Sequence, residues 1–113
     1  MNNSFQVTRL ENASNLTIVS IDVRENGSLV VNDWSTGDFA DEVYGADVDR
    51  FLELGPESVE KLLSSLKITA DSKTPESLAD YLTRQYKGEN RAMTKIRDLC
   101  DQHGVQYELE SWP

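Results

Sequence analysis

The clearest hydrophobic pattern lies in NLTIVSIDVRENGSLVVND, residues 15–33, where two runs rich in β-branched residues flank Asn26 and Gly27. An Asn-Gly pair accepts the positive φ angles of a two-residue hairpin turn, and alternating apolar and polar residues are typical of strands. Such a turn sets the register and places Val23 opposite Val30. The pattern therefore predicts a β-hairpin with a core-facing strip made of Val19, Ile21, Val23 and Val30.

Three other segments alternate as strands do. Residues 4–10 alternate weakly, VDRFLELG (48–55) runs as a strand into a glycine, and VQYELESW (105–112) closes the chain as a strand. The intervening residues 33–46 hold two glycines and no sustained period, so we expect a loop there, with one helical turn at residues 38–43. The pattern leaves open whether the last strand lies in the middle of the sheet or at its edge.

Three helices are predicted between the fourth strand and the last one. Pro56 fits a first helical position and is followed by apolar residues at helical spacing as far as Lys67. Thr74 before Pro75 is a cap-and-proline start for a second helix over residues 75–86. A third helix is expected in ENRAMTKIRDLCDQHG, residues 89–104, with Ala92, Ile96, Leu99 and His103 on its apolar stripe and Gly104 as the residue that terminates it.

This order predicts an α+β fold: a mostly antiparallel sheet of four to five strands, with three helices packed on one face. The 113 residues suit a single domain spanning 1–113. No export signal and no apolar run of about eighteen residues is present, so we expect a cytoplasmic protein that does not enter a membrane.

Negative charge is concentrated in the middle of the chain. The net charge is −9, and residues 33–60 contain nine acidic residues and one arginine. Charge of this sign repels phosphate backbones and anionic membranes, which disfavours nucleic-acid binding. It favours a basic protein partner, and it is equally explained by solubility alone.

The stretch NDWSTGDFADEVYGADVDRF, residues 32–51, sets aromatic residues among carboxylates. Protein interfaces draw their binding energy from Trp, Tyr and Arg, and clustered acids accelerate capture of a basic partner. We therefore expect Trp34 and Tyr44 to be the buried anchors and the acids to steer and pair with Lys or Arg. The predicted partner-binding residues are Trp34, Asp38, Asp41, Glu42, Tyr44, Asp47 and Asp49. The alternative is that the aromatic residues turn inward and plug the end of the sheet.

Catalytic or metal chemistry has two sets of candidate residues. The carboxylates of residues 33–49 are candidates for an irregular calcium site or an acid–base pair, although they do not match the spacing of an EF-hand. Cys100 and His103 lie three apart on one predicted helix, where a core thiol beside a helix-terminal imidazole is the favoured explanation. Zinc would require about four His or Cys ligands, and the chain has two. We predict no catalytic residue, metal ligand or cofactor.

A basic segment at residues 84–97 is the feature that favours a polyanion, and it supports a second alternative, a nucleic-acid-associated protein using this helix. It contains five basic residues: Arg84, Lys87, Arg91, Lys95 and Arg97. A solvated face that balances the acidic segment is the favoured interpretation.

Three stretches of the sequence carry a resemblance: NGSLVVNDWSTGDFADEVYG, DRFLELGPESVEKLLSSL and CDQHGVQYELESWP. In these stretches the chain resembles small acidic bacterial proteins, among them the immunity proteins that accompany polymorphic secreted toxins. The resemblance implies an enzymatically inert protein whose exposed acids block the basic active site or substrate groove of a toxin or nuclease. It assigns no individual contact residue. We expect the protein to be a monomer or a weak dimer.

Overall fold

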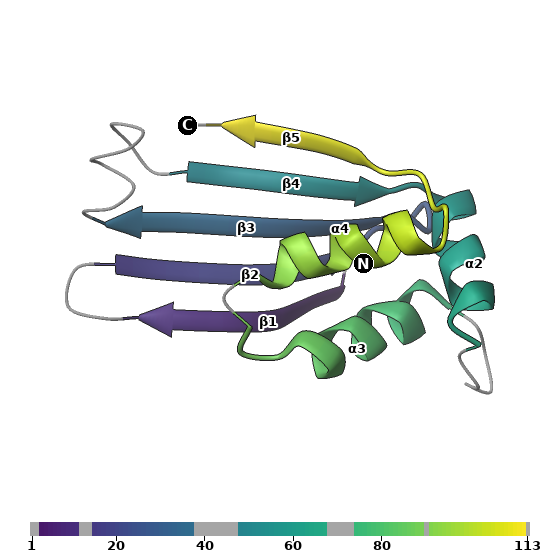
Figure 1. Cartoon of the computed structure of the whole chain (residues 1–113), viewed down its shortest axis with the longest axis horizontal. Coiled ribbons are helices and arrows are strands. Elements are labelled where there is room, and N and C mark those ends of the chain that lie inside the picture. The colour runs from purple at the N-terminus through teal and green to yellow at the C-terminus, as the bar shows by residue number, and fades with distance from the viewer. Residues whose placement is uncertain (1–2, 12–14, 38–47, 68–73, 90, 113) are drawn as a thin grey trace.

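A computed structural model describes residues 3–11, 15–37, 48–67, 74–89 and 91–112 of the chain. The elements follow in the order β1 (Asn3–Glu11), β2 (Asn15–Val23), β3 (Leu29–Gly37), β4 (Val48–Leu54), α2 (Pro56–Ser65), α3 (Pro75–Tyr86), α4 (Ala92–Gln102) and β5 (Glu108–Trp112). The predicted α+β class is confirmed (Figure 1).

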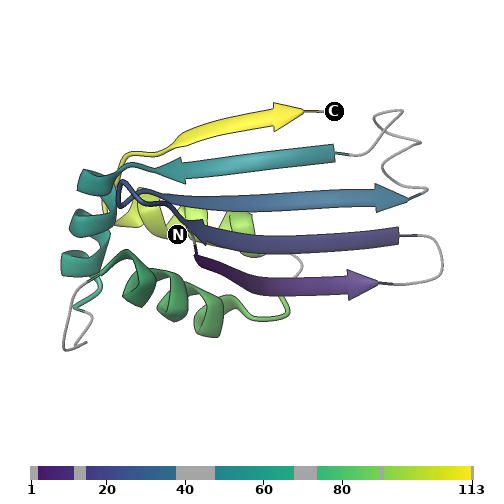
Figure 2. The ribbon, with the colours of Figure 1, turned by 180° about the vertical axis from the view of Figure 1, so that it is seen from behind.

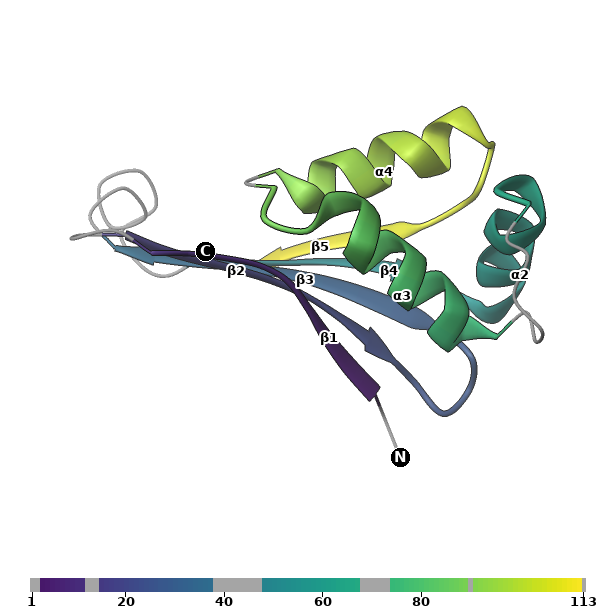
Figure 3. The same cartoon turned by 90° about the horizontal axis from the view of Figure 1, so that it is seen from below.

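The five strands form one antiparallel sheet in the order β1-β2-β3-β4-β5. Because the three helices are inserted between β4 and β5, the chain returns to the sheet after them, and β5 takes the edge beside β4 (Figure 1). The three described helices lie on one face of the sheet (Figure 3), and in the view from behind the strands pass in front of α4 (Figure 2). The end of the sheet where β3 finishes and β4 begins extends beyond the helices (Figure 3).

The β2–β3 turn differs from the prediction by one residue. The N–H of Arg24 donates to the carbonyl of Ser28 at 2.9 Å, and the N–H of Gly27 donates to the carbonyl of Arg24 at 3.0 Å. Gly27 has φ +90°, so the loop is a three-residue turn that ends on a left-handed glycine. Val23 therefore lies opposite Leu29. The predicted strip was wrong in one member, because Val30 faces away from the helices.

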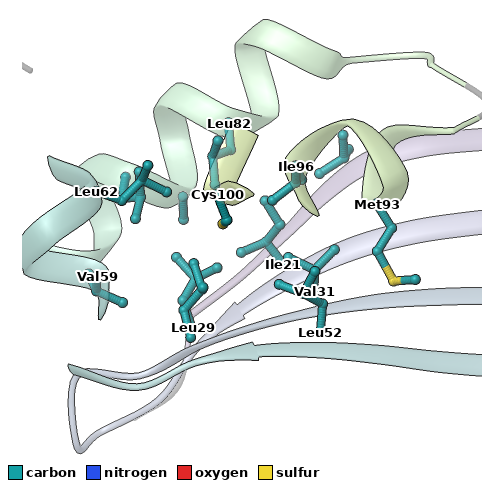
Figure 4. Close-up of a cluster of buried hydrophobic side chains, with 14 of the residues drawn as sticks. Ile21, Leu29, Val31, Leu52, Val59, Leu62, Leu82, Met93, Ile96 and Cys100 are labelled. Carbon is teal, nitrogen blue, oxygen red and sulfur yellow. The ribbon is translucent and has the colours of Figure 1, made fainter. Parts of the chain in front are cut away.

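The core lies between the helices and one face of the sheet. Ile21, Val31 and Leu52 occupy one row across β2, β3 and β4, and all three are fully buried. They point toward the apolar faces of the helices, and Figure 4 labels Leu62, Leu82, Met93, Ile96 and Cys100 among the facing side chains. Each Å² of apolar surface that this layer removes from water stabilises the fold by about 25 cal/mol, and this burial is the main stabilising contribution.

The helix boundaries follow local signals. The Oγ1 of Thr74 accepts a hydrogen bond from the N–H of Ser77 at 3.2 Å, which caps α3 where the prediction placed its start. The end of α4 is closed by Gly104, at φ +65°, and by the N–H of Val105, which donates to the carbonyl of Cys100 at 2.8 Å. Met93 and Cys100 are buried on this helix, whereas the predicted stripe residues Leu99 and His103 are only half-buried.

Three other predicted boundaries were wrong. Residues 33–37 belong to β3 and not to a loop, α4 begins at Ala92 and not at 89, and residues 105–107 precede β5 and are not part of it. The helical turn predicted at 38–43 lies outside the described residues. Within the part of the chain that the structure describes, no helix is long and apolar enough to cross a membrane.

Candidate functional site

Two of the predicted binding residues lie side by side in the sheet. Trp34 of β3 and Asp49 of β4 are directly opposite each other in the antiparallel register. Directly paired residues share a face of the sheet. Trp34 and Asp49 lie on the face opposite the buried row of Val31 and Leu52. Both side chains are half-buried. The other predicted residues, Asp38, Asp41, Glu42, Tyr44 and Asp47, lie outside the described residues.

The surface that carries this pair is the open face, defined as the side of the sheet opposite the helices (Figure 2). Its centre is apolar: Val30 is buried, and Ile18, Trp34 and Phe51 are half-buried. Ile18 lies opposite Trp34, and Phe51 lies opposite Asn32 in the neighbouring row. These residues form an apolar patch across β2, β3 and β4, which the polar Asn32 interrupts, and no described helix covers it.

Acidic side chains border this patch on both sides. One row across the sheet contains Asp22, Val30, Glu53 and Glu108, and the next contains Asn32, Phe51 and Glu110. The open face therefore gathers carboxylates from three strands, namely Asp22, Asp49, Glu53, Glu108 and Glu110. Apolar contact area ringed by charge is the usual composition of a protein-binding site.

The carboxylate of Asp49 is held in place by its neighbour. The Nδ2 of Asn32 donates to Oδ1 of Asp49 at 2.7 Å and to the carbonyl of Arg50 at 3.2 Å. This side chain fixes the orientation of the acid beside Trp34. A fixed carboxylate loses less conformational entropy when it pairs with an incoming cation.

Asp33 does not lie on the open face, because successive side chains of β3 point to opposite faces of the sheet. It lies on the helix-facing side, where its side chain is 4% exposed, and its Oδ2 accepts from Nη2 of Arg50 at 2.6 Å. One carboxylate of the acidic segment is thus neutralised within the fold and is not available to a partner. Asp33 and Asp49 also point to opposite faces, so they do not join in one calcium site. Among the described residues no group of three or more His, Cys, Asp or Glu is placed to hold a metal ion.

Cys100 and His103 do not form an activated pair. The thiol of Cys100 is fully buried in the core, and burial raises its pKa from 9.0 to about 11. At neutral pH the group is therefore the neutral thiol, whereas a nucleophile needs the thiolate. His103 caps the end of α4, where its backbone N–H donates to the carbonyl of Leu99 at 3.2 Å.

The basic segment at residues 84–97 is divided between α3, α4 and their connection, as the two predicted helices over 75–86 and 89–104 imply, so its cations do not share one helix. Three of its cations have acidic neighbours: Arg84 with Asp80 at 3.1 Å, Lys95 with Glu89 at 2.6 Å, and Arg97 with Asp98 at 3.8 Å. Lys87 and Arg91 are exposed without an ion pair among the described residues, so the pairing reduces the positive charge that could attract a polyanion but does not remove it.

Sequence reasoning did not include Phe51, Glu53, Glu108 and Glu110 among the site residues. Their alternation within each strand was visible in the sequence, but which strands are neighbours was not. No protein-family model matches the chain, and neither a curated protein nor a solved structure shows significant similarity to it.

Proposed function

We propose that the protein is a non-catalytic binding protein that neutralises a basic toxin or nuclease. It would do so through the open face of its sheet and the acidic residues within 33–49. The observation that carries the proposal is the register that sets Trp34 beside Asp49 on a face that the described helices leave uncovered. An aromatic anchor next to an oriented acid is suited to a Lys or Arg side chain, which stacks on the ring and pairs with the carboxylate.

The surrounding charge supports the same partner. Glu53, Glu108 and Glu110 have no basic partner among the described residues, so their field extends into solvent. Unpaired acids on one face raise the association rate of a cationic protein and make it depend on ionic strength. Asp38, Asp41 and Glu42, close in sequence to both strands, add charge of the same sign.

The test begins with the gene immediately upstream. If that gene encodes a toxin domain, the toxin is the expected partner. The toxin should arrest growth when it is expressed alone and should be harmless when it is expressed with this protein. The two purified proteins should form a complex whose association slows as salt is added. A toxin that neither binds this chain nor is neutralised by it would refute the proposal.

Matched variants then locate the contact. Glu53→Lys on the open face should slow association about tenfold and flatten its salt dependence, because it removes steering charge. Glu60→Lys, which reverses another exposed glutamate on α2, is the control and should act much less. Reversal of Asp38, Asp41 and Glu42 should act like Glu53→Lys. Association rates that are indifferent to all of these changes would exclude this surface.

The anchor needs a separate measurement, because it acts after encounter. Trp34→Ala should accelerate dissociation and weaken the complex by about tenfold or more, with little change in association rate. Ile18→Ala, at the position on β2 directly opposite Trp34, is the control. Its effect on dissociation shows how much affinity is lost when another apolar side chain of the patch is truncated.

A further inference from the structure

The two edges of the sheet differ in how they are protected. At β1 the register shifts between Gln6 and Thr8, so the edge strand carries a bulge. The N–H of Gly88 donates to the carbonyl of Val7 at 3.0 Å, and the Oγ1 of Thr8 donates to the carbonyl of Glu89 at 2.8 Å. The connection between α3 and α4 therefore occupies the middle of this edge, and bulges with covering segments are the usual protection against added strands.

Within the described part of the chain, the β5 edge has no such cover. Glu108–Trp112 pairs with β4 on one side, and among the described residues no hydrogen bond reaches its other side. In an antiparallel ladder alternate residues direct their N–H and C=O groups away from the neighbouring strand, so this edge presents unpaired donors and acceptors. Leu109 adds an apolar side chain that is 49% exposed.

The segment leading into β5 is already fixed. The Nζ of Lys61 donates to the carbonyl of Gly104 at 2.8 Å, and the hydroxyl of Tyr107 donates to Oδ1 of Asp101 at 2.8 Å. These bonds tie the start of the strand to α2 and α4. The pairing with β4 holds β5 itself extended before any partner arrives, which lowers the entropy cost of adding a strand.

Charge specifies what this edge can accept. Glu108 lies directly opposite Glu53, and Glu110 lies on the same face two residues further along. Like charges directly opposite across two strands are unfavourable, and neither Glu108 nor Glu110 has a basic neighbour among the described residues. Lys or Arg side chains from a strand placed beyond β5 would sit next to these acids and relieve the repulsion. A second copy of β5 would instead bring further glutamates to the same place.

We propose that the outer edge of β5 takes up an extended, basic segment of the protein partner as an additional strand, with Lys or Arg at alternate positions beside Glu108 and Glu110. The inference rests on the proposed function and names the way in which the partner binds. Backbone pairing supplies affinity in this mode, and the alternating side chains supply specificity.

A short peptide tests this edge without the natural partner. The probe is a capped peptide of alternating lysine and threonine, and its control carries the same side chains on a backbone methylated at every nitrogen. The unmethylated peptide should bind in calorimetry and slow amide hydrogen exchange within residues 108–112. The methylated peptide should bind at least about tenfold more weakly, since it cannot donate to the edge. Glu110→Lys should weaken binding about tenfold, and the control Glu60→Lys less than about twofold.

Three outcomes would overturn the proposal. One is equal binding of both peptides with no protection of β5, which would indicate charge attraction alone. Another is absence of binding at low ionic strength. The third is a dimer in sedimentation with residues 108–112 protected, which would assign the edge to a second copy. None of these results bears on neutralisation of the upstream toxin, so failure of strand addition and failure of the proposed function are distinguished.

Discussion

Nη2 of Arg50 lies 2.6 Å from Oδ2 of Asp33, and the contact joins β3 to β4 on the helix-facing side of the sheet. Asp33 is 4% exposed and Arg50 is 45% exposed, so a buried anion is compensated by a cation that reaches in from the surface. Removal of one member of such a pair leaves a charge without its partner.

We expect Arg50→Met to lower the free energy of unfolding by about 1–3 kcal/mol, below the value for a fully buried pair because Arg50 is half-exposed. Urea denaturation gives the difference. Arg84→Met, which removes a solvent-exposed partner of Asp80, is the control and should cost less than about 1 kcal/mol. Adding Asp33→Asn to Arg50→Met should recover part of the loss. Equal effects of Arg50→Met and Arg84→Met would mean that the buried pair contributes no special stability.

Gly27 should resist substitution because of its backbone angle. Its φ of +90° is unfavourable for a residue with a Cβ, although a Cβ at this position would meet its nearest neighbour, the Cβ of Pro56, at an ordinary 3.7 Å. Gly27→Ala should therefore destabilise the protein by about 1–2 kcal/mol through backbone strain and not through a clash. Thermal melting measures the loss. Gly88→Ala, at φ +79° with open space around the added Cβ, should cause a similar loss; an unchanged stability there would contradict the conformational explanation.

Cys100 should make stability fall in alkaline solution. Burial raises its pKa to about 11 from 9.0, so between these pH values the unfolded chain releases a proton that the folded chain retains. The stabilisation from this group is complete below pH 9 and is lost as the pH rises toward 11, at about 1.4 kcal/mol per pKa unit. Denaturation midpoints across this range should fall less in Cys100→Ala than in the natural chain.

The same burial predicts slow alkylation of Cys100 by iodoacetamide in the native protein and fast alkylation in urea. Cys100→Ser should retain partner binding. Rapid modification of the native thiol, or loss of binding without loss of folding, would point to a functional cysteine.

Calcium should leave the melting temperature unchanged. Asp33 is paired with Arg50, and strand alternation directs Asp49 to the other face, so two of the candidate oxygen ligands do not converge. An ion that bound specifically to the folded form would raise the midpoint as its concentration rose above the dissociation constant. A rise with calcium but not with magnesium would instead favour the calcium-module alternative.

The helices were predictable because their signals are local. Thr74 and Pro75 define the start of α3 in the sequence, and the structure places its bounds at Pro75 and Tyr86 as predicted. The end of α4 at Gln102, just before His103 and Gly104, also followed from a single glycine. Caps and proline act within one turn of helix, so no knowledge of the tertiary structure was needed.

The sheet was less predictable because its details depend on contacts far apart in the sequence. An Asn-Gly pair serves both a two-residue turn and a three-residue turn that ends on glycine, and the choice between them moves Val30 from one face to the other. The extension of β3 through Trp34 depends on pairing with β4, which the sequence alone does not reveal. For the same reason the proximity of Trp34 and Asp49 follows only from the register.

The bulge and the covering connection protect the middle of the β1 edge, so β5 is the less protected edge among the five described strands. If a partner strand docks at β5, each chain takes up one partner strand. The open face, bordered by Glu108 and Glu110, and the added strand would then form one binding surface. The partner would pair its backbone with β5 and at the same time contact the side chains of the open face.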